Sequence, residues 1–126
     1  MSNDTETIPQ KSESNLYGKI MGVVTDRSQL TALSESLETL GVHELEILTG
    51  SDGFERLESL KETVAQYFFG DMEAKMLQRY LDAVTHDQSV FVADLDPEIA
   101  SKAAEIAKTH GASEIVHFGN SAVTNY

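Results

Sequence analysis

The chain has 126 residues, of which 40% are hydrophobic, and its 21 acidic and 9 basic residues give a formal charge of −12. This balance disfavours nucleic acid and anionic membrane surfaces as partners, because both attract basic patches. The absence of cysteine excludes a disulfide scaffold and a thiolate zinc site, and it fits a cytoplasmic location. No apolar run approaches about 18 residues, so we expect no membrane span.

Residues 1–15 are rich in serine, threonine, asparagine and glutamate, and contain one apolar residue after Met1. A segment of this composition cannot bury enough surface to offset the entropy lost on ordering. We therefore expect a disordered tail over 1–15 and a single domain over 16–126.

The first half of the domain predicts a strand, a helix and a strand. Residues 19–26 (KIMGVVTD) are apolar on both faces of a strand. Residues 26–41 follow with helical periodicity, and we expect Asp26 to cap the helix and Gly41 to end it. Its apolar stripe consists of Leu30, Leu33, Leu37 and Leu40. The alternating residues 42–50 (VHELEILTG) predict the second strand.

The second half predicts the same three elements. Residues 89–95 (SVFVADL) form the third strand. Asp96 and Pro97 then open a helix as N-cap and first helical residue, and Gly111 ends it. The side chains expected to face inward from this helix are Ile99, Ala103 and Ile106. Residues 112–119 (ASEIVHFG) predict the last strand.

The two halves align with an offset of 70 residues, and in both halves 15 residues separate the cap from the stop. The aligned pairs are Asp26–Asp96, Gly41–Gly111, Glu44–Glu114 and Leu45–Ile115. Two β-α-β units of this kind predict an α+β, ferredoxin-like fold with a four-stranded antiparallel sheet in the order 4-1-3-2.

Between the halves, residues 54–85 carry two amphipathic stripes separated by Gly70, which predict two inserted helices in a βαβ–(αα)–βαβ arrangement. The first stripe contains Phe54, Leu57, Leu60, Val64 and Tyr67 or Phe68; the second contains Met72, Met76, Leu77, Tyr80, Leu81 and Val84. Residues 51–53 (SDG), followed by Glu55, are interpreted as an acidic turn that is too short for a calcium loop.

The two inner strands are apolar on both faces, whereas the helices of the two halves cover one face only. Either the inserted helices or a second copy of the chain must therefore cover the other face. A methionine-containing, aromatic stripe is more typical of a protein core than of a ligand site. The expected partner is accordingly another protein or a second copy in a homodimer.

The histidines are interpreted first as parts of the fold. His110 and His117 align with Leu40 and Ile47, where the first half places core-facing residues. His110 also falls in the last turn of its helix, where the dipole favours a cation.

The four histidines do not predict a metal site. In the expected topology His43 and His110 lie at one end of the sheet, on opposite edges and about 14 Å apart. His86 and His117 lie at the other end, about two strand spacings apart. This second pair, with Asp87 nearby, is the one that can converge, and a three-histidine site is not expected.

No motif in the sequence fixes a reaction, and we expect no catalytic residue, cofactor or metal. Asp94 and Asp96 could form an acid–base pair, but Asp96 is better explained as a helix cap. The ligand-binding candidates are His86, His117 and Tyr80.

Residues 77–119 (LQRYLDAVTHDQSVFVADLDPEIASKAAEIAKTHGASEIVHFG) resemble the heat-induced or general stress protein (YflT-like) domain of bacteria. The shared features are a helix with Tyr80, the strand SVFVADL, the turn LDPE, the helix AAEIAKTHGA and the strand EIVHFG. The first half is similar from VVTDRSQ to LETLGV, so the resemblance covers about 100 residues.

The chain departs from that family at two places. Many relatives carry a glycine-rich segment where this chain has residues 54–85, and glycines before the third strand, where this chain has His86, Asp87 and Gln88. The resemblance implies a stress-associated, non-enzymatic cytoplasmic protein, and the family supplies no catalytic residues to carry over.

Three functions follow as hypotheses. The first is a non-enzymatic, stress-associated interaction or regulatory module. The second is a regulatory domain that senses a small ligand, which rests on analogy of fold. The third and least expected is a small ferredoxin-like enzyme that uses His86 or His117 in a cleft between the sheet and the inserted helices.

Overall fold

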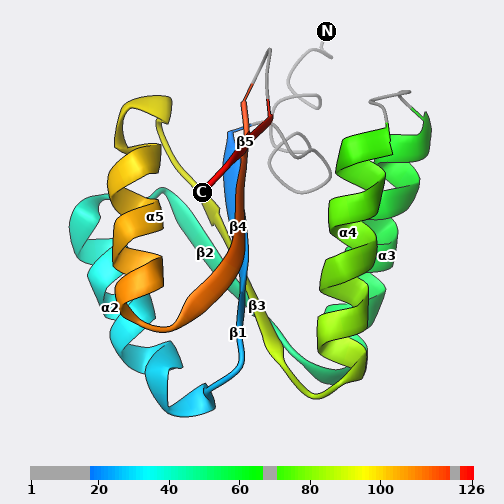
Figure 1. Ribbon diagram of the computed structural model, residues 1–126, viewed down its shortest axis with the longest axis horizontal. Helices are drawn as coiled ribbons and strands as arrows, with labels where there is room; N and C mark the ends of the chain where they lie inside the picture. The colour runs from blue at the N-terminus through cyan, green and yellow to red at the C-terminus, as the bar shows by residue number, and fades with distance from the viewer. Residues whose placement is uncertain (1–17, 67–70, 120–122) are drawn as a thin grey trace, which may run out of the picture.

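The computed structural model describes residues 18–66, 71–119 and 123–126. It is an α+β structure, in which one open antiparallel sheet lies between two layers of helices (Figure 1). The strands are β1 (Lys19–Val24), β2 (Glu44–Leu48), β3 (Ser89–Asp94), β4 (Ala112–Phe118) and β5 (Val123–Asn125), and their order in the sheet is β2-β3-β1-β4-β5. The predicted tail over 1–15 lies outside the described residues.

The helices of the described residues fall into two pairs. They are α2 (Leu30–Leu40), α3 (Gly50–Gln66), α4 (Asp71–Thr85) and α5 (Ala100–Thr109), with the short 3-10 helices η1 (Arg27–Gln29) and η2 (Pro97–Ile99) ahead of α2 and α5. Figure 1 shows α2 and α5 on one face of the sheet and α3 and α4 on the other.

The sheet has five strands, so the predicted count of four was wrong. The additional strand β5 is antiparallel to β4, with Val123 opposite Phe118 and Thr124 opposite His117. It has three residues, only one of them apolar. A segment this short shows no alternating pattern, and the sequence therefore gave no strand signal there.

The layer of α2 and α5 follows the predicted stripe in α2 and only part of the predicted stripe in α5. Leu33 and Leu37 of α2 are fully buried, while Leu30 and Leu40 are partly buried at the ends of the stripe. In α5 the most deeply buried side chains are alanines, namely Ala100, Ala103, Ala104 and Ala107. The predicted inward residues Ile99 and Ile106 are only partly buried. Small side chains therefore form the part of α5 nearest the sheet.

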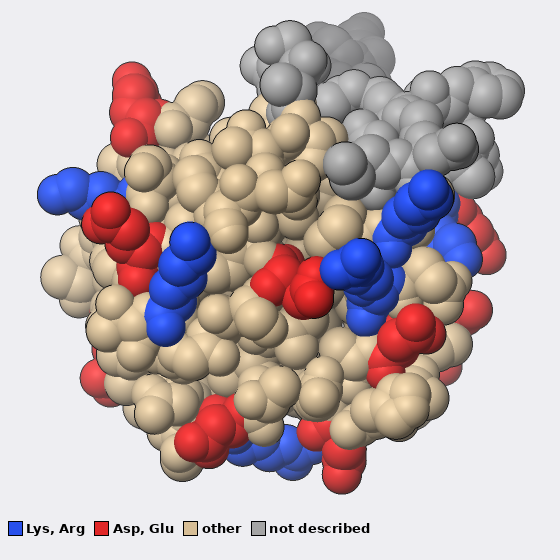
Figure 2. All heavy atoms as spheres, viewed as in Figure 1, with Lys and Arg blue, Asp and Glu red and all other residues tan. Residues whose placement is uncertain are grey.

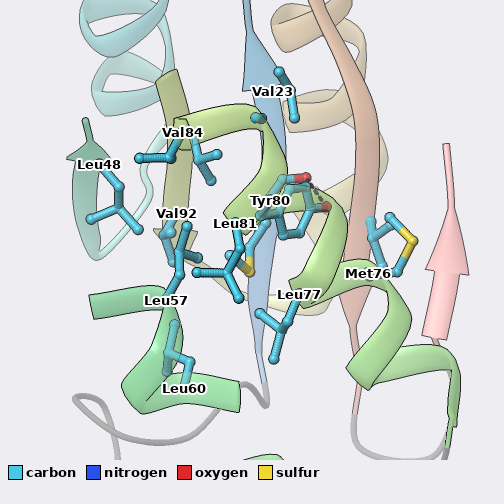
Figure 3. Close-up of a cluster of buried hydrophobic side chains, with 14 of the residues drawn as sticks. Val23, Leu48, Leu57, Leu60, Met76, Leu77, Tyr80, Leu81, Val84 and Val92 are labelled. Atoms are coloured by element: carbon cyan, nitrogen blue, oxygen red, sulfur yellow. Dashed lines mark hydrogen bonds between the residues drawn. The ribbon is translucent and has the colours of Figure 1, made fainter. Parts of the chain in front are cut away.

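The inserted helices cover the other face. Met21, Val23, Val90 and Val92 point away from α2 and α5 and pack in one cluster with side chains of α3 and α4. The helix side chains of this cluster are Leu57, Leu60, Met76, Leu77, Tyr80, Leu81, Ala83 and Val84 (Figure 3). The chain thus covers both faces of its own sheet. A second copy of the chain is therefore not needed to bury the apolar side chains of the inner strands.

Part of the predicted stripes cannot be compared with the structure. Val64, Tyr67, Phe68 and Met72, together with the separating Gly70, lie outside the residues whose side chains are described.

Asp26 caps the 3-10 helix η1, which leads into α2, and Gly41 ends α2 as predicted. The Asp26 carboxylate accepts hydrogen bonds from the Ser28 amide (3.0 Å) and hydroxyl (2.7 Å), and these bonds lower the pKa of Asp26. Gly41 has φ +114, and its amide donates to the carbonyls of Leu37 and Glu38. A left-handed residue at this position is the usual way to end a helix.

Asp96 is the N-cap residue of η2 and Pro97 opens that helix, as predicted, but the Asp96 side chain makes no capping hydrogen bond. Its carboxylate instead contacts His43 Nε2 at 3.1 Å, because β2 begins beside the end of β3. The predicted acidic turn over residues 51–53 was wrong, because these residues belong to the start of the helix α3. A Cβ on Gly53 would come within 2.8 Å of the Leu48 carbonyl carbon, so a glycine lets α3 start directly against β2.

A β-bulge interrupts the pairing of β1 with β4. The register shifts between Met21 and Val23, which leaves Glu114 and Ile115 opposite Gly22. Glu114 has φ +53, a left-handed conformation that costs a residue with a side chain roughly 1 kcal/mol or more. Bulges with this geometry re-aim the side chains and carbonyls next to them.

Candidate functional site: a polar cleft beside α4

The cleft opens at one end of the sheet, along the side of α4 that faces β1 and β4. At this end Val24 pairs with both Ser89 and Ala112, and we call it the Ala112 end; at the opposite Phe118 end, Lys19 pairs with Asp94 and Phe118. The cleft has a volume of about 510 Å³. Its lining residues are Val23, Thr25, Arg79, Asp82, Ala83, His86, Gln88, Ser113 and Glu114.

Helix α4 supplies one wall. Arg79, Asp82 and His86 stand at positions i, i+3 and i+7, so they lie on one side of the helix. Their neighbours on the adjacent side, Tyr80 and Val84, are buried in the core. The apolar stripe of α4 therefore fixes the helix on the sheet, and the same packing holds the polar side at the rim of the cleft.

The bulge supplies the opposite wall. The Glu114 carboxylate contacts Arg79 Nη1 at 2.6 Å, and the Glu114 carbonyl accepts a hydrogen bond from the Tyr80 hydroxyl at 2.7 Å. The same hydroxyl lies 3.4 Å from the Met21 carbonyl (Figure 3). One strained residue is thus connected to α4 twice, once through its side chain and once through its backbone.

His86 is held at the end of α4 in a defined tautomer. Its Nδ1 lies 2.7 Å from the Asp82 carbonyl, which can only accept, so Nδ1 carries the proton when the ring is neutral. Nε2 is then left as a hydrogen-bond acceptor. His86 is exposed at the mouth of the cleft.

The remaining polar side chains of the cleft retain unused capacity. Thr25, Gln88 and Ser113 line it, and within the described part of the chain their side chains make no hydrogen bond. Arg79 uses one terminal nitrogen on Glu114, and Asp82 accepts from Gln78 Nε2 at 3.2 Å. The cleft therefore presents hydroxyls, an amide, an imidazole nitrogen and both signs of charge to solvent.

The candidate Tyr80 lies behind the wall of the cleft rather than in it. Its side chain is fully buried and its hydroxyl is occupied by the bulge. Burial, together with the nearby negative charge of Glu114, raises the pKa of Tyr80 far above its usual range, against the opposing effect of Arg79. Tyr80 therefore stays neutral and acts as a hydrogen-bond donor that positions Glu114.

The candidate His117 lies on the other face of the sheet, away from the cleft. It is 6% exposed on β4, between Ile20 of β1 and Thr124 of β5, on the side of α2 and α5. Its Nε2 is buried without a hydrogen-bond partner among the described residues. Burial lowers the pKa of His117, so the ring is neutral at neutral pH.

The expected pairing of the histidines by sheet end was wrong. Both β3 and β4 are antiparallel to β1, so they run in the same direction. His86, just before β3, therefore lies at the Ala112 end, while His117, near the end of β4, lies at the Phe118 end. His43 precedes β2 and His110 precedes β4, and these two strands run in opposite directions. His43 and His110 therefore lie at opposite ends of the sheet.

A second groove, of about 560 Å³, separates α2 from α5 on the outer side of that layer. Its lining residues are Glu35, Ser36, Thr39, Glu105, Ile106, Thr109 and His110. His110 was expected in the last turn of its helix; it is the C-cap residue that follows α5, and its Nε2 lies 3.2 Å from Ser36 Oγ. This bond joins the two repeated helices and accounts for His110 structurally.

His43 and Asp96 form an exposed pair at the Phe118 end. The hydrogen bond to Asp96 raises the pKa of His43, and the charges of Asp96 and Asp94 add to the effect. In the described ranges no group of three or more histidine, aspartate or glutamate side chains is arranged to hold a metal ion.

Figure 2 shows the distribution of charge on one face of the molecule. In Figure 2 the acidic and basic side chains of the visible face are intermixed, with uncharged surface between them. None of the described helices combines the length and apolar character needed to cross a bilayer.

Sequence reasoning found His86 but missed Arg79, Asp82, Ser113 and Glu114. The spacing of Arg79, Asp82 and His86 on the polar side of a predicted helix was the available signal. Nothing in the sequence marked Glu114, because the repeat aligns it with Glu44, an ordinary residue of β2.

Comparisons of the chain with protein-family models, with curated proteins and with solved structures found no match.

Proposed function

We propose that this chain is a non-catalytic regulatory module that binds a small polar ligand in the cleft beside α4. The observation that carries the proposal is the double connection of Glu114, a residue in a left-handed conformation, to Arg79 and Tyr80 of α4. Strained residues persist where the surrounding structure holds them, and they concentrate at binding sites and switches.

The size and composition of the cleft support ligand binding. Its volume of about 510 Å³ falls within the range of roughly 300–1,000 Å³ that is usual for small-molecule sites. The groove between α2 and α5 is similar in size. In that groove, however, Ser36 and His110 are hydrogen-bonded to each other, and no lining residue has a left-handed backbone.

The connection also supports a regulatory role. A ligand that draws Arg79 or Glu114 toward itself changes the wall that holds the Tyr80 hydroxyl, and hence the seating of α4 on the sheet. Such a change requires the ligand to bind more tightly when α4 is in one position on the sheet than when it is in another.

We further propose that the fold is ferredoxin-like, extended by β5 and by the inserted pair α3 and α4. The adjacency of β2, β3, β1 and β4, in that order, supports this interpretation. The stress association rests on the resemblance of residues 77–119 and stays a prediction.

A ligand is proposed ahead of a homodimer for two reasons. The two faces of the sheet are covered within one chain. Glu44 is exposed on the edge strand β2, and two copies paired around it would bring like charges together, whereas Glu46 is already paired with Arg56. The enzyme hypothesis keeps His86 as its candidate, since His86 alone of the pair lines the cleft.

The test is thermal unfolding against a broad panel of small polar metabolites at millimolar concentration. A ligand of the native state raises the melting temperature. We expect at least one compound to do so for the wild type and for Thr39→Ala, which alters the other groove, but not for Gln88→Ala in the cleft. Identical melting with every compound contradicts the proposal, and turnover that depends on His86 replaces it with the enzyme hypothesis.

A further inference from the structure

We propose that the ligand of the cleft is a zwitterion with adjacent ammonium and carboxylate groups, that is, a free α-amino acid. This inference rests on the proposed function and concerns the chemistry of the same site. It follows from the charges that line the cleft and from their placement on α4.

The balance of charge disfavours simple ions. The ionic groups that line the cleft are the guanidinium of Arg79 and the carboxylates of Asp82 and Glu114. An anion such as phosphate would have to approach two carboxylates on a chain of net charge −12. A simple cation would pair with Asp82 but leave the Arg79 donors that do not contact Glu114 without an acceptor, and a neutral polyol would match neither sign of charge.

The spacing favours opposite charges on one small molecule. Arg79 and Asp82 are three residues apart on α4, which places their Cβ atoms about 5–6 Å apart. Arg79 has further N–H donors beyond the one on Glu114, and among the described residues the Asp82 carboxylate accepts one hydrogen bond, from Gln78. A carboxylate on Arg79 and an ammonium on Asp82 can therefore bind side by side, as they occur in an α-amino acid.

The rest of the cleft suits the polar ends and a variable side chain. His86 Nε2 can accept a hydrogen bond from a second N–H of the ammonium group, because Nδ1 already donates to the Asp82 carbonyl. Thr25 and Ser113 supply hydroxyls to the carboxylate. Val23 and Ala83 form an apolar floor that can contact a ligand side chain.

The experiment measures melting temperature and, by calorimetry, affinity for the twenty common L-amino acids, each tested singly. Every amino acid that binds is then compared with its N-acetyl derivative and its methyl ester, which lack the ammonium and the carboxylate respectively. Inorganic phosphate and a neutral disaccharide complete the probes.

We expect at least one amino acid to bind and both of its derivatives to bind at least about tenfold more weakly, the loss typical of one charged hydrogen bond. Asp82→Asn keeps the acceptor for Gln78 but removes the charge, and should weaken the amino acid more than its N-acetyl derivative. Thr39→Ala should bind as the wild type does.

The outcomes separate the two proposals. Binding of phosphate or the disaccharide that is lost in Gln88→Ala, without binding of any amino acid, overturns the zwitterion and leaves the ligand site standing. Equal binding of an amino acid and both derivatives also overturns the zwitterion. If no compound of either panel binds, the ligand site itself is contradicted.

Discussion

The two helical layers cover the same sheet in different ways. In the layer of α2 and α5, the two helices are repeated elements, joined by Ser36 and His110 and packed through leucines and alanines. In the layer of α3 and α4, larger side chains fill the interface, and α4 packs mainly on β3 and β1 and reaches β4 through the contacts of Arg79 and Tyr80 with Glu114. The cleft lies beside α4 at the β1–β4 side of the inserted layer, whereas the groove of the other layer lies between its two helices.

The largest expected effects test whether both layers are integral to the fold. Leu37→Ala in α2 and Leu77→Ala in α4 each empty a fully buried position. Each should lower the free energy of unfolding by about 2–5 kcal/mol, from lost burial and the cavity left behind. Urea unfolding measures both. A Leu77→Ala cost below 1 kcal/mol would mean that the inserted layer is loosely attached, and the comparison would fail.

Gly22→Ala tests the close packing opposite the bulge. A Cβ at Gly22 would come within 2.5 Å of Phe91 Cε2 and 3.1 Å of Ile115 Cγ1. Because the backbone of Gly22 is not left-handed, the cost is steric, and we expect about 1–3 kcal/mol by urea unfolding.

The matched control is Gly41→Ala, which has φ +114 and nothing within 4 Å of its added Cβ. Its cost comes from the backbone alone and should be about 1 kcal/mol. If Gly22→Ala is as stable as the wild type, the packing of β1 against Phe91 is looser than described.

Tyr80→Phe isolates the bond between α4 and the bulge. The substitution keeps the ring in the core but removes the donor to the Glu114 carbonyl. We expect a loss of about 1–2 kcal/mol, because a buried acceptor is left without its partner. Hydrogen exchange of β4 amides should rise near Glu114. Unchanged stability and exchange would show that the hydroxyl does not hold the bulge.

The smallest expected effects concern the pH dependence of stability, for which His117 and His43 should have opposite influences. Burial lowers the pKa of His117 in the folded state below its value in the unfolded chain. The contribution of neutral His117 to the free energy of unfolding is therefore present above the unfolded-state pKa and is lost as the pH falls through the folded-state pKa. Asp96 raises the pKa of His43, so its contribution is present below the unfolded pKa and is lost as pH rises through the folded one.

The measurement is the free energy of unfolding between pH 7.5 and pH 5. His117→Ile, which restores the residue found at the aligned Ile47, should reduce the loss of stability toward pH 5. His43→Gln should have the opposite and smaller effect, because His43 is exposed. An unchanged pH profile in His117→Ile would mean that its ring is protonated or hydrated in the folded state.

How much the sequence could predict differs between the secondary structure and the candidate site for a physical reason. Periodicity, caps and the 70-residue offset are local signals, and they predicted the strands β1 to β4 and the helices α2 to α5 to within a few residues. They also placed apolar residues on both faces of the inner strands, and hence the need for a second layer.

The features of the site depend on contacts between distant residues, which no local pattern records. The left-handed Glu114 arises from the register between β1 and β4, and the Asp96 side chain turns to His43 because β2 starts beside it. The error over His86 and His117 was one of strand direction: the topology was expected, but its consequence for the two ends of the sheet was drawn incorrectly.

The most direct test of the cleft is the ligand response of Glu114→Gly. Glycine tolerates φ +53, so relief of the strain should roughly offset the lost Arg79 pair and keep the free energy of unfolding within about 1 kcal/mol of the wild type. We predict that the rise in melting temperature produced by the ligand is reduced, because Arg79 loses the partner that holds it at the wall of the cleft. A full ligand response in this stable variant would contradict the assignment of the cleft as the binding site.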